Sequence, residues 1–115
     1  MKQPLTAALV AALVVAAPAG VGAASAPARS AQTRTVRIHD IGFHPSRLVI
    51  KRGDSVRWKF VDPEVSHNVT SRGHARFHSS PTRLTGSYRT RFTRRGTYRY
   101  VCTIHPNMRG SVVVR

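Results

Sequence analysis

Apolar and polar residues alternate in short runs through most of this 115-residue chain, and turn-forming residues separate the runs. Successive side chains of a β-strand point to opposite faces, so a period of two predicts strands with one buried face. The runs cover residues 36–41, 48–50, 56–60, 88–92, 97–101 and 111–114, with turns at Pro45, Gly53-Asp54, Arg95-Gly96 and Arg109-Gly110. Many short strands about ten residues apart predict an all-β fold, in which two antiparallel sheets pack as a sandwich.

The section from residue 71 to residue 87 carries the weakest pattern. It is rich in Ser, Gly, Thr and Arg, which are typical of loops and turns. We expect one irregular strand near residues 75–79, with loops on either side. No helical periodicity of useful length follows the first 24 residues, so the pattern predicts no helix in the folded domain.

The first 24 residues have the layout of a secretory signal peptide. Lys2 precedes an apolar run at 5–17, and small residues follow it. We expect cleavage between about residues 23 and 28, a flexible Ala/Ser/Pro-rich lead-in at 25–32, and the domain at 33–115. An uncleaved membrane anchor is the alternative, but the run is shorter than the roughly 20 residues of a spanning helix. The protein is therefore expected to be exported, to the periplasm, the cell envelope or the extracellular space.

A possible metal site lies near the C-terminus, where Cys102, His105 and Met108 are spaced three residues apart. Thiolate and thioether ligands select copper, and blue-copper sites combine two His and one Cys with a weak axial Met. The candidate for the second His is His67, because a sandwich brings loops from distant strands together at one end. The sequence therefore predicts a copper site made of His67, Cys102, His105 and Met108.

Cys102 is the single cysteine of the chain, so no internal disulfide forms. A small buried core residue is the alternative explanation, since unpaired Cys is among the most buried residue types. In an oxidising compartment a thiol needs protection by a metal or by burial. The neighbouring His105 and Met108 favour the metal.

The other histidines are weaker candidates. His74 and His78 would lie on one face of an extended segment about 13 Å apart, which is too far to share one ion. His39 and His44 flank the first turn. We expect His74 and His78 to be solvated loop residues, and His39 and His44 to be surface or edge residues, rather than ligands.

The composition is strongly basic, with 19 Lys and Arg against 4 Asp and Glu and a formal net charge of +15. A self-repelling, soluble surface and a dedicated docking surface both explain this excess. In either case the charge favours acidic partner proteins, or an anionic envelope or membrane surface, with attraction that weakens as salt is added. It also disfavours self-association, so we expect a monomer. Nucleic acid is not expected, because no nucleic-acid-binding motif appears.

Three segments together closely resemble the cupredoxins, most of all the plastocyanin and amicyanin branch. They are Phe43-His-Pro-Ser-Arg-Leu-Val-Ile-Lys-Arg-Gly-Asp-Ser-Val-Arg-Trp58, Ser66-His-Asn-Val69 and Gly96-Thr-Tyr-Arg-Tyr-Val-Cys-Thr-Ile-His-Pro-Asn-Met-Arg-Gly-Ser-Val-Val-Val114. Two residues separate His105 from Met108, as in the tight amicyanin loop. The resemblance covers essentially the whole chain after residue 33.

The resemblance implies a Greek-key two-sheet β-sandwich in which His67, Cys102, His105 and Met108 bind one copper ion. The ion would cycle between Cu(II) and Cu(I) and carry single electrons between redox proteins. It also implies that Asn68 ties the two ligand loops together, with its backbone N–H directed at the Cys102 sulfur. Ile104 departs from the amicyanin pattern, which has Pro there, and its N–H would add a second hydrogen bond to the sulfur. His105 is the ligand expected nearest the surface, and electrons would pass through it.

Rival functions differ in the sites that they need. A multicopper enzyme needs further centres with His-x-His ligands, and a dinuclear copper site needs a second Cys; the sequence contains neither. The chain is therefore not expected to be an enzyme. A copper chaperone or storage protein without a redox role remains the main alternative. A basic sandwich that binds anionic polymers, with incidental copper, is the third.

Overall fold

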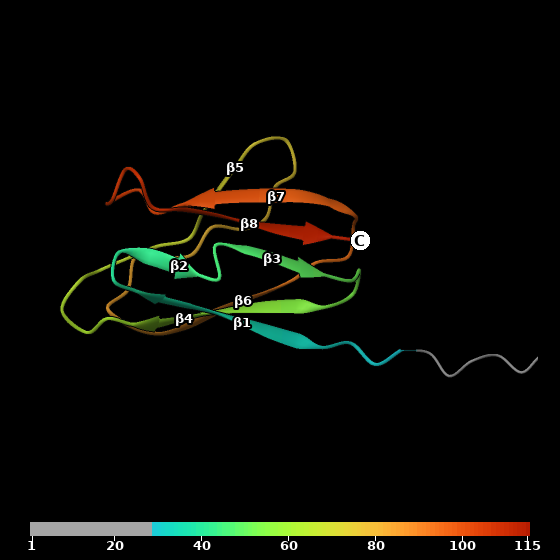
Figure 1. Cartoon of the computed structure of the whole chain (residues 1–115), viewed down its shortest axis with the longest axis horizontal. Helices are drawn as coiled ribbons and strands as arrows, with labels where there is room; N and C mark the ends of the chain where they lie inside the picture. Colours follow the sequence, from blue (N-terminus) through green and yellow to red (C-terminus); the bar gives the residue numbers. More distant parts are fainter. Residues whose placement is uncertain (1–28) are drawn as a thin grey trace, which may run out of the picture.

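The computed structural model describes residues 29–115, which form eight β-strands and no helix (Figure 1). The strands are β1 (Thr33–His39), β2 (Gly42–His44), β3 (Arg47–Ile50), β4 (Ser55–Val61), β5 (Thr70–Arg72), β6 (Thr85–Arg91), β7 (Gly96–Val101) and β8 (Arg109–Val114). The expected signal peptide and its cleavage site lie outside the described residues. Within the described part, nothing helical is long and apolar enough to cross a membrane.

Two four-stranded sheets pack face to face, with strand orders β2-β1-β4-β6 and β3-β8-β7-β5. The chain leaves the first sheet after β2, adds β3 to the second and returns with β4, so β4 lies beside β1 and runs parallel to it. The β3–β8 pair is parallel as well. The predicted Greek-key two-sheet sandwich is confirmed, but the expectation that both sheets are antiparallel throughout is wrong for these two pairs.

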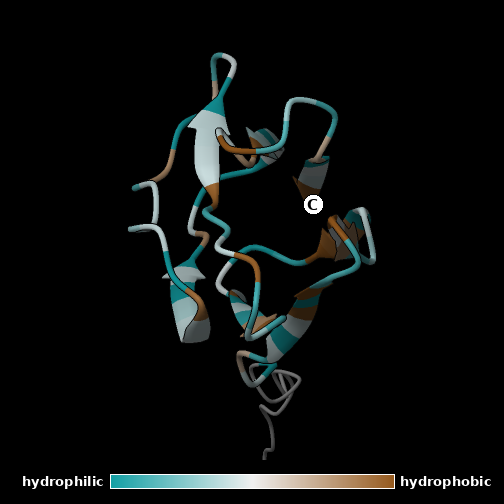
Figure 2. Cartoon of the chain, turned by 90° about the vertical axis from the view of Figure 1, so that its left-hand side faces the viewer, coloured by the Kyte–Doolittle hydropathy of each residue, from teal (hydrophilic) through white to brown (hydrophobic). Residues whose placement is uncertain are grey.

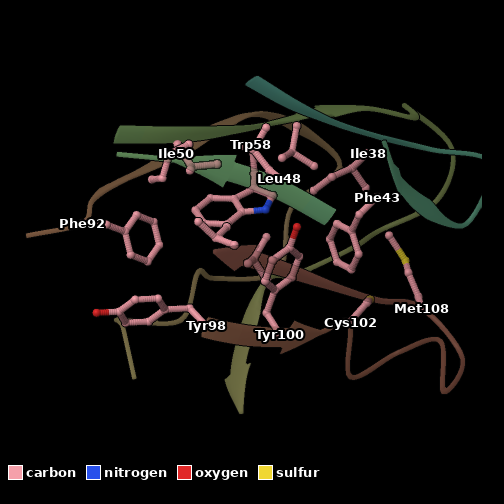
Figure 3. Close-up of a cluster of buried hydrophobic side chains, with 14 of the residues drawn as sticks. Ile38, Phe43, Leu48, Ile50, Trp58, Phe92, Tyr98, Tyr100, Cys102 and Met108 are labelled. Carbon is pink, nitrogen blue, oxygen red and sulfur yellow. The ribbon is translucent and has the colours of Figure 1, made fainter. Parts of the chain in front are cut away.

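The core lies between the sheets and is built from the inward residues of the alternating runs. Figure 2 shows this alternation as teal and brown bands along the strands. Trp58 on β4 is fully buried and stacks on Phe77. Tyr100 on β7 packs edge-on against both Trp58 and Phe43 (Figure 3). Aromatic pairs at these distances add to the stabilisation that comes from area burial alone. This cluster fills the space between the sheets and reaches the loops at one end, where Cys102 and Met108 belong to it.

The first hairpin differs from the expected single run at 36–41. β1 ends at His39, and a two-residue turn at Asp40 and Ile41 leads into β2. Both turn residues have positive φ, of 50° and 52°, as the tightest hairpin turns require. Ile41 is 54% exposed and belongs to no strand face. The apolar side chain at 41 suggested a strand position, whereas the backbone needs a turn there.

The expected strand at 75–79 is also wrong, because the strand of this region is β5, at 70–72. Between β5 and the segment at 79–80, serine side chains accept hydrogen bonds that a strand would accept through its backbone. The Ser79 hydroxyl accepts from the Ser71 N–H, and the Ser80 hydroxyl accepts from the Val69 N–H. Hydroxyl groups that satisfy backbone donors in this way compete with sheet formation. The segment therefore lies against β5 without becoming a strand.

The first strand, β1, starts at Thr33. Of the expected lead-in at 25–32, the last four residues are described. Arg29 donates two hydrogen bonds of 2.8 Å to the buried carboxylate of Asp54, and the Gln32 N–H donates a third, of 2.9 Å. These contacts attach residues 29–32 to the turn between β3 and β4.

Candidate metal centre

Two loops meet at one end of the sandwich, opposite the C-terminus (Figures 1 and 2). One follows β4 and carries His67; the other joins β7 to β8 and carries Cys102, His105 and Met108. The two strands that lead into these loops belong to different sheets. Residues 35 positions apart in the sequence therefore lie together where the sheets face each other.

The side chains of His67, Cys102 and His105 form a compact donor group. Their ligand atoms all lie within 4.8 Å of one another, and among the described residues they are the one group of at least three His, Cys or acidic side chains gathered this closely. The Cys102 Sγ is 3.5 Å from the His105 Nδ1, and the two imidazole rings have their centroids 4.9 Å apart. One thiol and two imidazoles match the donor types that copper prefers in proteins.

His67 is fully buried, yet neither of its ring nitrogens has a hydrogen-bond partner. The nearest acidic atom, Asp62 Oδ2, is 3.6 Å from Nε2, which is beyond hydrogen-bonding distance. A buried polar group without a partner costs free energy, so its persistence needs an explanation. Burial also lowers the pKa of His67 from its ordinary value of 6.5, which favours the neutral imidazole that metals bind. A metal ion would supply the missing partner, so these residues fit copper.

The loop from 102 to 108 is closed by its own backbone. The Cys102 N–H donates to the Met108 carbonyl at 3.0 Å, and the Met108 N–H donates to the His105 carbonyl at 2.9 Å. Cys102 is 1% exposed and Met108 2% exposed, and Figure 3 shows Met108 beside Phe43. His105 is half-buried, so of the four predicted ligands it lies nearest the surface, as expected.

Asn68 ties the two loops together through its side chain. Its Nδ2 donates to the Thr103 Oγ1 at 2.8 Å, and its Oδ1 accepts from the Thr103 N–H at 3.1 Å. Nδ2 also donates to the Thr82 Oγ1 at 3.2 Å, and the Thr70 hydroxyl donates to Oδ1 at 2.7 Å. The predicted tie is present. The hydrogen bonds expected from the backbone N–H groups of Asn68 and Ile104 to the sulfur stay predictions.

The backbone of His67 is held from the other side by Arg83. The His67 N–H donates to the Arg83 carbonyl at 3.0 Å, and the Arg83 N–H donates back at 2.9 Å, which makes an isolated bridge. Sequence reasoning missed both this bridge and Thr103, because neither belongs to a strand pattern. The Ser and Thr content of the region was the only available signal.

The remaining histidines lie away from the donor group. His39 and His44 stack with ring centroids 4.2 Å apart, and His39 Nδ1 is 2.8 Å from the Asp40 carboxylate. His74 and His78 are exposed on the segment after β5. None of the four is part of the gathered group in the described part of the chain.

A two-sheet sandwich with a His–Cys–His group between its end loops, two of whose members are buried, is typical of copper-binding β-sandwich proteins. The family model described as "Cupredoxin-like domain" matches residues 5–114, and the chain belongs to this family. Amicyanin-alpha of Methylorubrum extorquens is 35% identical over 92 residues, which are 77% of this chain and 75% of that protein. Amicyanin of Paracoccus denitrificans is 37% identical over 82 residues, which are 69% of this chain and 63% of that protein.

Solved structures give the same result. A methionine-to-glutamine variant of amicyanin with Cu(I) superposes with a TM-score of 0.66 and 32% identity, covering 72% of this chain and 82% of that chain. A reduced proline-to-phenylalanine variant of amicyanin gives 0.63 and 34%, with the same coverage. A purple cupredoxin from Nitrosopumilus maritimus, at 24% identity, a TM-score of 0.62 and coverage of 71% and 99%, shares the fold. The family and the His–Cys–His grouping together indicate copper binding.

Proposed function

We propose that this protein is an exported blue copper protein that shuttles single electrons between redox partners. His67, Cys102, His105 and Met108 would hold one copper ion. Bound copper supplies one-electron chemistry, because it alternates between Cu(II) and Cu(I). The observation that carries the proposal is the close approach of the His67, Cys102 and His105 donor atoms, combined with the unpartnered nitrogens of the fully buried His67.

The chain's own residues support electron exchange better than metal delivery. Burial of Cys102 and His67 keeps water away from the donor atoms. The Asn68 side chain and the backbone bonds of the 102–108 loop hold the donors in place, so little rearrangement is needed between two charge states. A chaperone needs an open site from which the metal leaves. Three of the four proposed ligands are at most 2% exposed.

His105 is the proposed route for electrons, because it is the one proposed ligand that is not fully buried. Its loop begins at Cys102 and ends at Met108, so a partner that contacts this loop comes close to the donor group. The relatives named amicyanin include forms described as reduced and as containing Cu(I). A redox role for this chain is consistent with those descriptions.

The test is copper loading of the processed protein, followed by a visible spectrum, metal analysis and a redox titration. We expect an intense blue band, one copper per chain, and reversible bleaching with one electron. His105→Ala should severely slow electron exchange with a protein partner, whereas the control His74→Ala, at an exposed histidine outside the group, should not. Copper binding without the blue band or without reversible reduction would instead support a chaperone or storage protein.

A further inference from the structure

A row of arginines crosses the outer face of the second sheet. Arg47 on β3 is paired with Ser111 on β8, Ser111 with Arg99 on β7, and Arg99 with Arg72 on β5. Paired residues of neighbouring strands share a face, and all three arginines are exposed. With strands about 4.8 Å apart, the row spans about 14 Å. We call Arg47, Arg72, Arg99 and the adjacent Arg109 the arginine row.

The arginine row is not neutralised by the protein itself. The four Asp and Glu side chains of the sequence all lie in the described part. Asp54 forms an ion pair with Arg29, while Asp40 and Asp62 lie beside histidines. None of these pairs involves an arginine of the row. Arg72 and Arg99 lie directly opposite each other on neighbouring strands. Like charges in this arrangement destabilise a sheet. In residues 29–115 no ion pair offsets the repulsion within the row.

The arginine row adjoins the proposed electron route. It lines a shallow cavity of about 530 Å³ whose rim also includes Pro106, the residue after His105. Arg109 follows Met108, so the row continues into the end of the ligand loop. The outer face of the first sheet is basic too, with Arg57 opposite Arg89, but the cavity there is lined by no residue of the 102–108 loop.

We propose that the arginine row is the docking surface for an acidic face of a redox protein partner, and that it seats this partner beside His105. Guanidinium groups bind carboxylates through paired hydrogen bonds, and several of them spread over about 14 Å suit a cluster of Asp and Glu side chains better than one small anion. An anionic polymer would gain nothing from adjacency to the ligand loop, whereas an electron-transfer partner would. The inference rests on the proposed function and adds the chemistry of the partner.

The test compares two double variants that remove the same charge from opposite faces. Arg72→Gln with Arg99→Gln alters the arginine row; Arg57→Gln with Arg89→Gln alters the equivalent opposed pair on the first sheet. Each copper-loaded protein is mixed with reduced cytochrome b5, an acidic haem protein, in a stopped-flow instrument at low and at physiological salt. Reduction by ascorbate is measured in parallel, since it reports whether the copper site itself is intact.

We expect the row variant to react with cytochrome b5 about tenfold more slowly than wild type at low salt, with a weaker salt dependence, because local charges steer association. The control variant should slow much less. Ascorbate is a small monoanion, so its rates should change far less than the cytochrome rates in both variants. The row variant should unfold at the same or a higher denaturant concentration than wild type, because a repulsive pair is removed.

Equal slowing of both variants would overturn the proposal, because it would mean that net charge alone guides encounter. So would unchanged cytochrome rates together with weakened binding of the row variant to polyphosphate or to vesicles of anionic lipid. Failure of every protein to be reduced by ascorbate would refute the proposed function itself, and with it the inference. The two failures are therefore distinguishable.

Discussion

Asn68→Ala should destabilise the protein by loosening the contact between the two ligand loops. The wild-type side chain makes four hydrogen bonds, two of them to Thr103 in the loop that begins at Cys102. At about 1 kcal/mol each, their loss would cost about 4 kcal/mol. Thr82 and Thr103 are exposed, so water replaces part of the loss, and about 2 kcal/mol is the expected decrease in the free energy of unfolding.

The assay is urea denaturation of the copper-free protein, followed by the fluorescence of the buried Trp58. Thr82→Val is the matched control, because it removes only the longest of the four bonds, of 3.2 Å, and should cost less than about 1 kcal/mol. In the copper-loaded protein, Asn68→Ala should also speed the loss of copper and alter the visible spectrum. The reasoning is refuted if the free energy of unfolding of Asn68→Ala lies within about 0.5 kcal/mol of wild type, or is no lower than that of Thr82→Val. The Asn68 side chain would then not be what holds the two ligand loops together.

Acid should weaken the fold through Asp54, because hydrogen bonds from the Arg29 guanidinium hold the pKa of this carboxyl well below its ordinary value of 3.8. The stabilisation from the ionised Asp54 is complete above about pH 4 and is lost as the pH falls toward the folded-state pKa. Asp54→Asn should flatten the pH dependence of the free energy of unfolding in denaturation curves. An unchanged pH profile in this variant would contradict the role of Asp54. Gly110→Ala should cost about 1–3 kcal/mol, because a Cβ there would lie 2.6 Å from the Tyr100 ring, and wild-type stability in a thermal melt would disprove the clash. Ile104→Pro should lower the reduction potential in a redox titration by removing an N–H that is expected to bond to the Cys102 sulfur; an equal or higher potential would refute that bond.

Much of the sandwich follows from local pattern. The alternating residues of β4 and β7, such as Trp58, Phe60, Tyr98 and Tyr100, predicted the inward face, and all four are buried. Period-two alternation identifies a strand and its face, but it carries no information about which strand lies beside it. The parallel pairing of β1 with β4 depends on where the chain crosses between sheets, and no local signal encodes that step.

The wrong predictions at residue 41 and at residues 75–79 have the same origin, because a local pattern does not report backbone geometry or hydrogen-bond partners. Ile41 looked like a strand residue because it is apolar, but the hairpin demands positive φ at that position. The segment after β5 bonds through serine hydroxyls, and a residue pattern does not distinguish a hydroxyl acceptor from a loop in water. At the candidate site, ligand chemistry and spacing predicted that His67, Cys102 and His105 would be neighbours. The supporting contacts of Thr103 and Arg83 depend on loop geometry and appear only in three dimensions.

In the proposed site, the Cys102 thiolate and the His67 and His105 imidazoles bind one copper ion. X-ray absorption spectroscopy at the copper edge of the loaded protein tests it most directly, with Cys102→Ala as the comparison. We expect one short copper–sulfur distance and two copper–nitrogen distances, with the short sulfur signal lost in the variant. A copper environment made only of nitrogen and oxygen in the wild-type protein, or one that Cys102→Ala leaves unchanged, would contradict it.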